Sequence, residues 1–237
     1  MKTIGSTIIM LALASSLFAG NGMELKLASP DGANEIVFYQ KQVSPAVNEL
    51  CYRVDYKSQP VVNESRAGLE LDNRIWEMAL GVRNLKQPAC WMDNLEVDSV
   101  TYQPETNLTW QPLYGERSSV RDHYRAGTLC LSKKDNSGYR LNIEVRAYNE
   151  GVAFRYFFPE HPKAIFHKVV GDLTEYALPA GTKAWTEQWA QAFFERLNID
   201  DIKHPVERAL TFELPNGKWA ALADADVDDS CLPKYLV

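Results

Sequence analysis

Residues 110–124 hold the densest group of side chains in the chain that could recognise a ligand. The stretch WQPLYGERSSVRDHY combines aromatic rings, guanidinium groups, carboxylates and an imidazole. Pro112 and Gly115 interrupt regular structure, so the first part is expected to form a shaped turn. The structural alternative is that Trp110 and Tyr114 fill the core. The charged side chains would then form a surface ion-pair ladder: Arg117, Arg121 and Asp122.

Glu187 is the second candidate, because it lies where a strand pattern gives way to a helical one and is flanked by Trp185 and Trp189. A carboxylate at such a junction can point out of the fold toward a partner domain or a metal ion. The alternative is a glutamate in the first turn of a helix, where it complements the helix dipole and contributes little stability. The residues alone leave both interpretations open.

The common catalytic patterns are absent. The chain has no His-Glu-x-x-His, no Gly-x-Ser-x-Gly and no glycine loop that would cradle a phosphate. The histidines show no metal-ligand spacing: His123, His161, His167 and His204. A calcium-binding EF-hand loop starting at Asp224 would need Gly at position 229 and Glu at position 235, where the chain has Asp229 and Tyr235. We therefore interpret this acidic run as a solvated turn.

Composition and charge narrow the class of protein. Of the 237 residues, 46% are hydrophobic and 24% are charged, which is typical of a globular protein with a sizeable core. The net charge of −6 and the lack of a long Lys/Arg run argue against a nucleic-acid-binding surface. An acidic, aromatic-rich surface is compatible with neutral ligands such as sugars.

Residues 1–20 have the pattern of a secretory signal peptide. Lys2 gives a basic start, residues 8–13 are apolar, and small residues at 15–20 suit cleavage near Ala19 or Gly20. No later stretch is long and apolar enough to span a membrane. Export would place the cysteines in an oxidising compartment. Cys51, Cys90, Cys130 and Cys231 allow three full pairings, and free buried thiols are an equal alternative.

A period of two dominates residues 21–237, which we treat as one domain. Residues 140–147 alternate apolar and polar, Asn149-Glu150-Gly151 turns the chain, and residues 152–158 resume the alternation, which predicts an antiparallel hairpin. Weaker strand patterns occupy residues 24–28, 35–40, 49–56, 68–72, 95–102, 128–133, 209–214 and 218–223. The sequence therefore predicts an all-β fold, a large antiparallel β-sandwich.

Residues 186–197 are the exception. Trp189, Phe193 and Leu197 are spaced four apart, and Thr186 could cap a helix N-terminus. This spacing predicts a short helix or helical turn that leans on a sheet.

Several ordered motifs resemble the N-terminal region of glycoside hydrolase family 97. They are WQPLYGE at 110–116, RDHY at 121–124, NEGVAFRYFFP at 149–159, and Leu178-Pro179 leading to Trp185-Thr186-Glu187. LASPDG at 27–32 and GLEL at 68–71 fit as well, so the resemblance covers nearly all of the chain after the signal peptide.

The resemblance implies a mutarotase-like sandwich followed by a catalytic (β/α)8 barrel, in secreted and often periplasmic bacterial enzymes that hydrolyse α-glucosides or α-galactosides. A calcium ion beside the active site would be shared by the two domains. Glu187 matches the calcium ligand from the sandwich, although Thr186 stands where the family commonly has an aromatic residue and Gln188-Trp189 replaces a smaller pair. We expect that the chain ends before the barrel and holds no catalytic acid or base.

Three hypotheses follow. The leading one is the N-terminal domain of a calcium-dependent α-glycosidase, which delivers Glu187 to the ion and walls one side of a pocket for an oligosaccharide or glycoside. The second is a stand-alone carbohydrate-binding module whose aromatic side chains stack on a pyranose. The third is a mutarotase-type epimerase, which needs a His and a Glu in one cleft, and the sequence shows no convincing pair.

Overall fold

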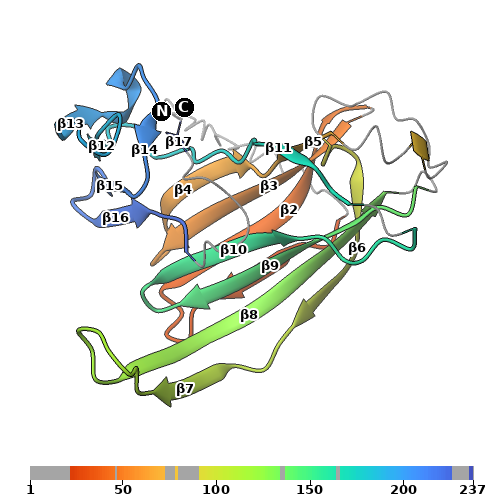
Figure 1. Ribbon diagram of the computed structural model, residues 1–237, viewed down its shortest axis with the longest axis horizontal. Helices are drawn as coiled ribbons and strands as arrows, with labels where there is room; N and C mark the ends of the chain where they lie inside the picture. Colours follow the sequence, from red (N-terminus) through yellow and green to blue (C-terminus); the bar gives the residue numbers. More distant parts are fainter. Residues whose placement is uncertain are drawn as a thin grey trace, which may run out of the picture.

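The computed structural model is built almost entirely of antiparallel strands (Figure 1). It describes residues 22–45, 47–72, 78–79, 91–133, 137–163, 166–225 and 235–236. The predicted signal peptide lies outside these residues. Within them, no helix has both the length and the apolar character that a membrane span requires.

The first large sheet is a meander in the order β1-β2-β3-β4. Its strands are Leu25–Ala28, Asn34–Ser44, Val47–Tyr56 and Gln59–Arg66. The turn between β1 and β2 contains Gly32, whose φ of 74° favours glycine. The Asp31 carboxylate accepts hydrogen bonds from Ser29 Oγ at 2.6 Å and from the Ala33 backbone N–H at 2.9 Å, which fixes the turn.

The second large sheet has the order β10-β9-β8-β6, with β7 also paired to β8. Its strands are β6 (Leu95–Tyr102), β7 (Thr106–Trp110), β8 (Val120–Lys133), β9 (Arg140–Tyr148) and β10 (Gly151–Phe157). The first half of β8 pairs with β7 and the second half with β6, so β8 runs the length of the sheet (Figure 1). The predicted hairpin is confirmed, since β9 and β10 pair with Val145 opposite Phe154.

Shorter strands complete the chain. They are β5 (Leu69–Leu71), β11 (Val169–Asp172), β12 (Lys183–Thr186), β13 (Glu195–Asn198), β14 (Val206–Glu207), β15 (Leu210–Glu213), β16 (Trp219–Leu222) and β17 (Tyr235–Leu236), with one 3₁₀ turn, η1 (Ile199–Asp201). β11 pairs with β5 and β14 with β17. The other four form a separate sheet in the order β13-β12-β15-β16, at the upper left of Figure 1.

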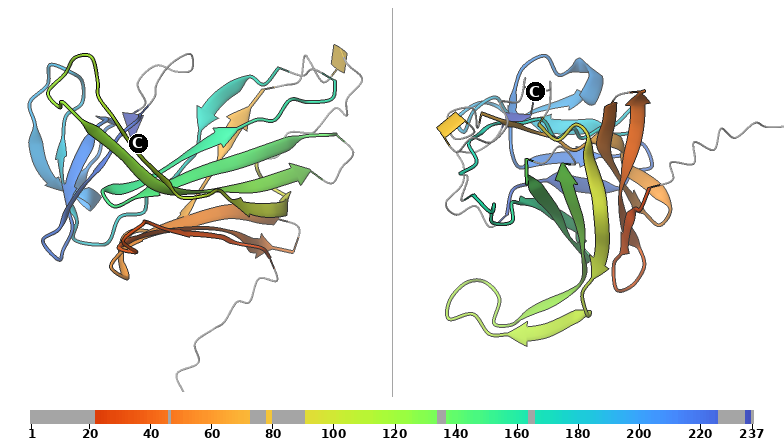
Figure 2. Two further views of the ribbon diagram at one scale, coloured as in Figure 1. Left: turned by 90° about the horizontal axis from the view of Figure 1, so that it is seen from below. Right: turned by 90° about the vertical axis from the view of Figure 1, so that its right-hand side faces the viewer.

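The two large sheets pack face to face and enclose the main core (Figure 2). Phe38 of β2 stacks on Tyr52 of β3 with ring centroids 5.3 Å apart, and both rings meet Phe154 of β10 at 5.2 Å. These contacts join the two sheets, and the all-β sandwich predicted from the alternation is confirmed. A second, smaller core lies under the four-stranded sheet: Ala184, Val206, Leu210, Phe212 and Leu214.

The helix predicted at residues 186–197 is wrong. β12 and β13 form a hairpin in which Trp185 pairs with Arg196 and Thr186 with Glu195. The intervening residues make one short turn, closed by a hydrogen bond from the Ala192 N–H to the Trp189 carbonyl at 2.7 Å. The fourfold spacing was misleading because Phe193 is 93% exposed and therefore does not mark a buried helix face.

Two of the cysteines are free thiols in the structure. Cys51 is buried and Cys130 is half-buried. Burial, together with the nearby Glu64 and Glu49, raises the pKa of the Cys51 thiol to about 11. A thiol that resists ionisation is a poor nucleophile, so Cys51 acts as a core residue. Cys90 and Cys231 lie outside the described residues.

His167 lies among aromatic rings at one end of the main core. Its ring stacks on Phe158 at 4.3 Å and contacts Tyr139 at 5.8 Å. Burial, with a smaller effect from His161, lowers the pKa of His167 to about 4. In the unfolded chain a histidine has a pKa of about 6.5. The stability that neutral His167 provides is therefore complete above that pH and is lost as the pH falls toward 4.

The variant His167→Phe is expected to be less sensitive to acid. Phenylalanine can keep the stacking contact with Phe158 but cannot take up a proton. The loss of unfolding free energy between about pH 7.5 and about pH 5 should therefore shrink by roughly 1 to 2 kcal/mol. Urea unfolding of both proteins at the two pH values measures the difference. Equal losses in the two proteins would show that His167 does not control this acid sensitivity.

Candidate functional site

The stretch at residues 110–124 forms the end of a projecting hairpin. Residues 111–119 join β7 to β8, and Gly115 has a φ of 114°, so the predicted shaped turn is confirmed. The alternative that Trp110 and Tyr114 fill the core is wrong. Trp110 is 52% exposed, Tyr114 is 90% exposed, and Leu113 between them is fully exposed.

The charged side chains of this hairpin do not form the expected ladder. Arg121 Nε donates to Asn107 Oδ1 on β7 at 3.0 Å, where a partner such as Asp122 had been expected. Residues 121 and 122 are neighbours on a strand. Their side chains therefore point to opposite faces of the sheet and cannot form an ion pair with each other.

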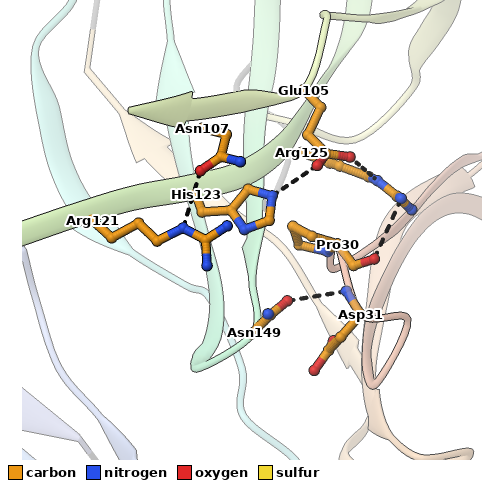
Figure 3. Close-up of polar contacts among 8 residues, drawn as sticks. All are labelled: Pro30, Asp31, Glu105, Asn107, Arg121, His123, Arg125 and Asn149. Atoms are coloured by element: carbon orange, nitrogen blue, oxygen red, sulfur yellow. Dashed lines mark hydrogen bonds and ion pairs between the residues drawn. The ribbon is translucent and has the colours of Figure 1, made fainter. Parts of the chain in front are cut away.

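A cluster around Glu105 anchors the hairpin to the sandwich (Figure 3). The carboxylate binds His123 Nε2 at 2.7 Å through one oxygen and Arg125 Nε at 3.0 Å through the other. Arg125 also donates to the Pro30 carbonyl at 3.4 Å, and the neighbouring Asp31 N–H donates to Asn149 Oδ1 at 3.1 Å. Three turns of the fold therefore meet at one polar network.

The pairing of His123 with Glu105 was not predicted from the sequence. The fold of the hairpin brings the two side chains together. The hydrogen bonds from His123 and then Arg125 lower the pKa of the Glu105 carboxyl. A carboxylate held ionised by two partners is a weak proton acceptor. Glu105 also lies at the surface, so the pair supports a structural role and gives no support to the epimerase hypothesis.

Glu187 follows the last residue of β12 and is half-buried. Its backbone carbonyl accepts a hydrogen bond from the Glu207 N–H at 3.0 Å, and Thr186 Oγ1 donates to the Glu195 carbonyl at 3.3 Å. Its carboxylate forms no hydrogen bond or ion pair with the other described residues. Because no helix begins here, the helix-dipole alternative is wrong, and an uncommitted carboxylate remains at a fixed strand end.

The part of the chain that the structure describes contains no group of three His, Cys, Asp or Glu side chains that could hold a metal ion. Asp224, the first residue of the acidic run, forms an ion pair with Arg208 Nη1 at 2.6 Å. Asp226, Asp228 and Asp229 lie outside the described residues. Any metal ion bound at Glu187 would therefore need ligands from beyond these residues.

A groove of about 1430 Å³ separates β11 and the following segment from the four-stranded sheet. Arg208 lies in its wall and is largely buried, with its guanidinium 5.6 Å from the Tyr176 ring centroid. The Arg208 Nε has no hydrogen-bond partner in the described part of the protein. His204 and Arg66, which forms ion pairs with Asp93 and Glu49, also line the groove.

Comparison with known families decides the identity of the fold. The family model described as Glycosyl-hydrolase 97 N-terminal matches residues 27–233. The chain belongs to this family. The GH97 N-terminal domain thus accounts for nearly all of the sequence after residue 26, as the ordered motifs predicted.

A curated relative has an assigned activity. The domain is 26% identical over 178 residues to a retaining alpha-galactosidase of Bacteroides thetaiotaomicron, a match that covers 75% of this chain and 22% of the relative. The chain thus spans less than a quarter of that enzyme's length.

Solved structures share the fold. A glycoside hydrolase family 97 enzyme of Pseudoalteromonas sp. strain K8, in complex with panose, matches with a TM-score of 0.67 and 24% identity. The match covers 81% of this chain and 27% of that enzyme. A β-arabinopyranosidase matches with a TM-score of 0.66 and 16% identity, over 86% of this chain and 32% of its own. At these identities the similarity shows a common fold.

Proposed function

We propose that this GH97 N-terminal domain works in a secreted, calcium-dependent α-glycosidase of the bacterial periplasm, beside a catalytic barrel. The family match over residues 27–233 and the alpha-galactosidase relative support a glycosidase. The solved enzyme in complex with panose supports an oligosaccharide or glycoside as substrate. Since the chain spans 22% of the alpha-galactosidase, most of such an enzyme would lie in a further domain.

Glu187 is the residue we assign to the calcium ion. The observation that carries the assignment is its half-buried carboxylate, which has no partner among the described residues. Calcium prefers oxygen ligands, carboxylates above all, and usually takes six to eight of them. One carboxylate at the edge of a domain fits an ion whose other ligands come from the catalytic barrel and from water.

The backbone around Glu187 is held on both sides. The bond from Glu207 fixes the Glu187 carbonyl, and the β12–β13 pairing fixes Thr186. A ligand that starts from a rigid strand end can be positioned more accurately than one on a long loop. When bound, calcium would supply a fixed positive charge that polarises the glycosidic oxygen or positions the catalytic acid.

Hydrolysis of a glycoside needs two carboxyl groups that flank the scissile bond, one of which protonates the leaving oxygen. Two carboxylates line the large groove, but both are engaged by the fold: Asp172 accepts hydrogen bonds from the Thr174 N–H and Oγ1, and Glu175 accepts one from the Arg66 N–H. We therefore assign to this domain the binding of the ion and the shaping of one wall of the pocket.

The purified chain alone is expected to show no hydrolysis of nitrophenyl α-glucosides or α-galactosides above the buffer rate, with or without calcium. Release of nitrophenol measures this directly. The matched control is a complete family 97 enzyme assayed under the same conditions. Hydrolysis that co-purifies with the folded chain would contradict the proposal that the catalytic carboxylates lie in the other domain.

A further inference from the structure

A cleft of about 530 Å³ lies between the four-stranded sheet and the end of the sandwich. Phe212, Ala220 and Leu222 face this cleft, because Phe212 is opposite Ala220 in the register and side chains alternate along a strand. Trp219 points to the other face of the sheet, where its ring stacks on Trp185 with centroids 4.5 Å apart. The cleft is therefore bounded by the core-facing side of the sheet.

Aromatic and aliphatic side chains form most of the cleft lining. Tyr52, Phe154 and Tyr176 contribute from the main core, and Phe212 and Leu214 contribute from the second core. The Tyr52 ring centroid lies 5.2 Å from that of Phe154 and 6.3 Å from that of Tyr176, so this wall is packed in place. Ligand sites commonly combine a preformed apolar wall of this kind with a few polar groups.

Asn34 is a buried polar side chain of the cleft. It is 8% exposed, and its Nδ2 donates to the Tyr148 and Asn149 carbonyls at 3.1 and 2.9 Å. Its Oδ1 accepts no hydrogen bond from the described residues. Within the described part of the chain, the side-chain atoms that lack both a partner and solvent contact are Trp91 Nε1 and Arg208 Nε, so solvent reaches Asn34 Oδ1. Because Asn34 lines the cleft, this oxygen is an acceptor that a ligand in the cleft can use.

Further uncommitted polar groups lie at the same end of the sandwich. Tyr56 is opposite Asn34 in the register of β2 and β3, and its hydroxyl forms no hydrogen bond with the described residues. The Glu150 carboxylate and Asn149 Nδ2, on the turn between β9 and β10, also have no partner among them. All of these residues line the cleft, which therefore offers both donors and acceptors.

The charges at the cleft favour a neutral ligand. The charged residues of its lining are Lys218 and Glu150, one of each sign. Lys218 Nζ and Lys57 Nζ lie 4.6 and 5.2 Å from the Tyr56 ring centroid. Asp31, whose N–H is bound to the β9–β10 turn, adds a second carboxylate close by. A ligand with a net charge would gain from one sign and be repelled by the other.

We propose that this cleft binds a neutral mono- or disaccharide. A pyranose has an apolar C–H face, which suits the aromatic wall, and an edge of hydroxyls that both donate and accept hydrogen bonds. Its hydroxyls donate to Asn34 Oδ1 and Glu150 and accept from Asn149 Nδ2 or the Tyr56 hydroxyl. A purely apolar ligand would leave these groups unpaired. Glu187 does not line the cleft, so sugar binding here needs neither calcium nor a second domain.

The test is a calorimetric titration of the whole chain with maltose and with melibiose, in the presence of a calcium chelator. At least one of the two sugars is expected to bind. Tyr56→Phe and Glu150→Gln are each expected to weaken that binding by about threefold to tenfold, because each removes one hydrogen-bonding or charged group. Neither side chain forms a hydrogen bond within the described fold, so both variants should keep the stability of the parent. Tyr114→Phe is the matched control, since Tyr114 is 90% exposed and lies outside the cleft, and it should bind like the parent.

Cyclohexanol is the control ligand, because it has a ring of similar size and a single hydroxyl. It is expected to bind at least about tenfold more weakly than the sugar. Cyclohexanol binding as tight as that of the sugar would assign the cleft to apolar ligands and overturn the proposal. Binding of neither sugar by the folded parent would overturn it too, as would equal sugar binding by the parent, Tyr56→Phe and Glu150→Gln. Glu187→Gln should leave sugar binding unchanged, so this assignment and the calcium assignment fail independently.

Discussion

Phe38→Ala is expected to lower the free energy of unfolding by about 4 kcal/mol, because a large buried ring is replaced by a cavity. Phe38 is 0% exposed and contacts Tyr52 in its own sheet and Phe154 in the facing sheet. The aromatic cluster therefore joins the two layers, and its loss removes contacts that neither sheet can replace.

Urea unfolding measures this effect when the same slope of unfolding free energy against urea concentration is applied to both proteins. Phe193→Ala is the matched control, since the same ring is removed from a side chain that is 93% exposed. That substitution should change the unfolding free energy by no more than about 0.5 kcal/mol. A loss below about 1.5 kcal/mol for Phe38→Ala would contradict the placement of this cluster at the centre of the sandwich.

The sequence predicted the strands that have one buried and one exposed face. In β9, Leu141, Ile143 and Val145 alternate with polar residues, and this pattern is the direct consequence of a half-buried sheet. β7 was missed because nearly all of its residues are exposed, so it has no alternation. β4 was missed because its sequence, QPVVNESR, is mostly polar and carries a proline.

The candidate site was predicted only in part. Glu187 was predicted at the end of a strand pattern, between two tryptophans, but the hairpin of β12 and β13 was not predicted, because a helix was expected after it. Trp185 and Trp219 are far apart in sequence, and the register of three strands brings them together. Cross-strand partners of this kind depend on pairing between distant segments, which local patterns do not encode.

Glu187→Gln is expected to weaken calcium binding by about 100-fold in a protein that carries both this domain and the catalytic barrel. Glutamine has nearly the same shape but no negative charge, so the ion loses a charged ligand and keeps at most a weak carbonyl contact. The backbone bonds that hold Glu187 do not involve the side chain, so the fold should persist. Hydrolysis should fall together with calcium occupancy.

Glu195→Gln is the control for this substitution. Glu195 lies across the hairpin on β13, is exposed, and contributes its backbone carbonyl to Thr186. The change removes one negative charge at the position opposite Thr186, the neighbour of Glu187 in the chain, without removing the proposed ligand. It separates a general electrostatic effect, which should be small at a solvent-exposed position, from direct coordination.

The most direct measurement is a calorimetric calcium titration of the two-domain protein and of its Glu187→Gln and Glu195→Gln variants. The assignment predicts that the parent and Glu195→Gln bind calcium alike and that Glu187→Gln binds it about 100-fold more weakly. Unchanged calcium affinity in the folded Glu187→Gln protein would contradict it.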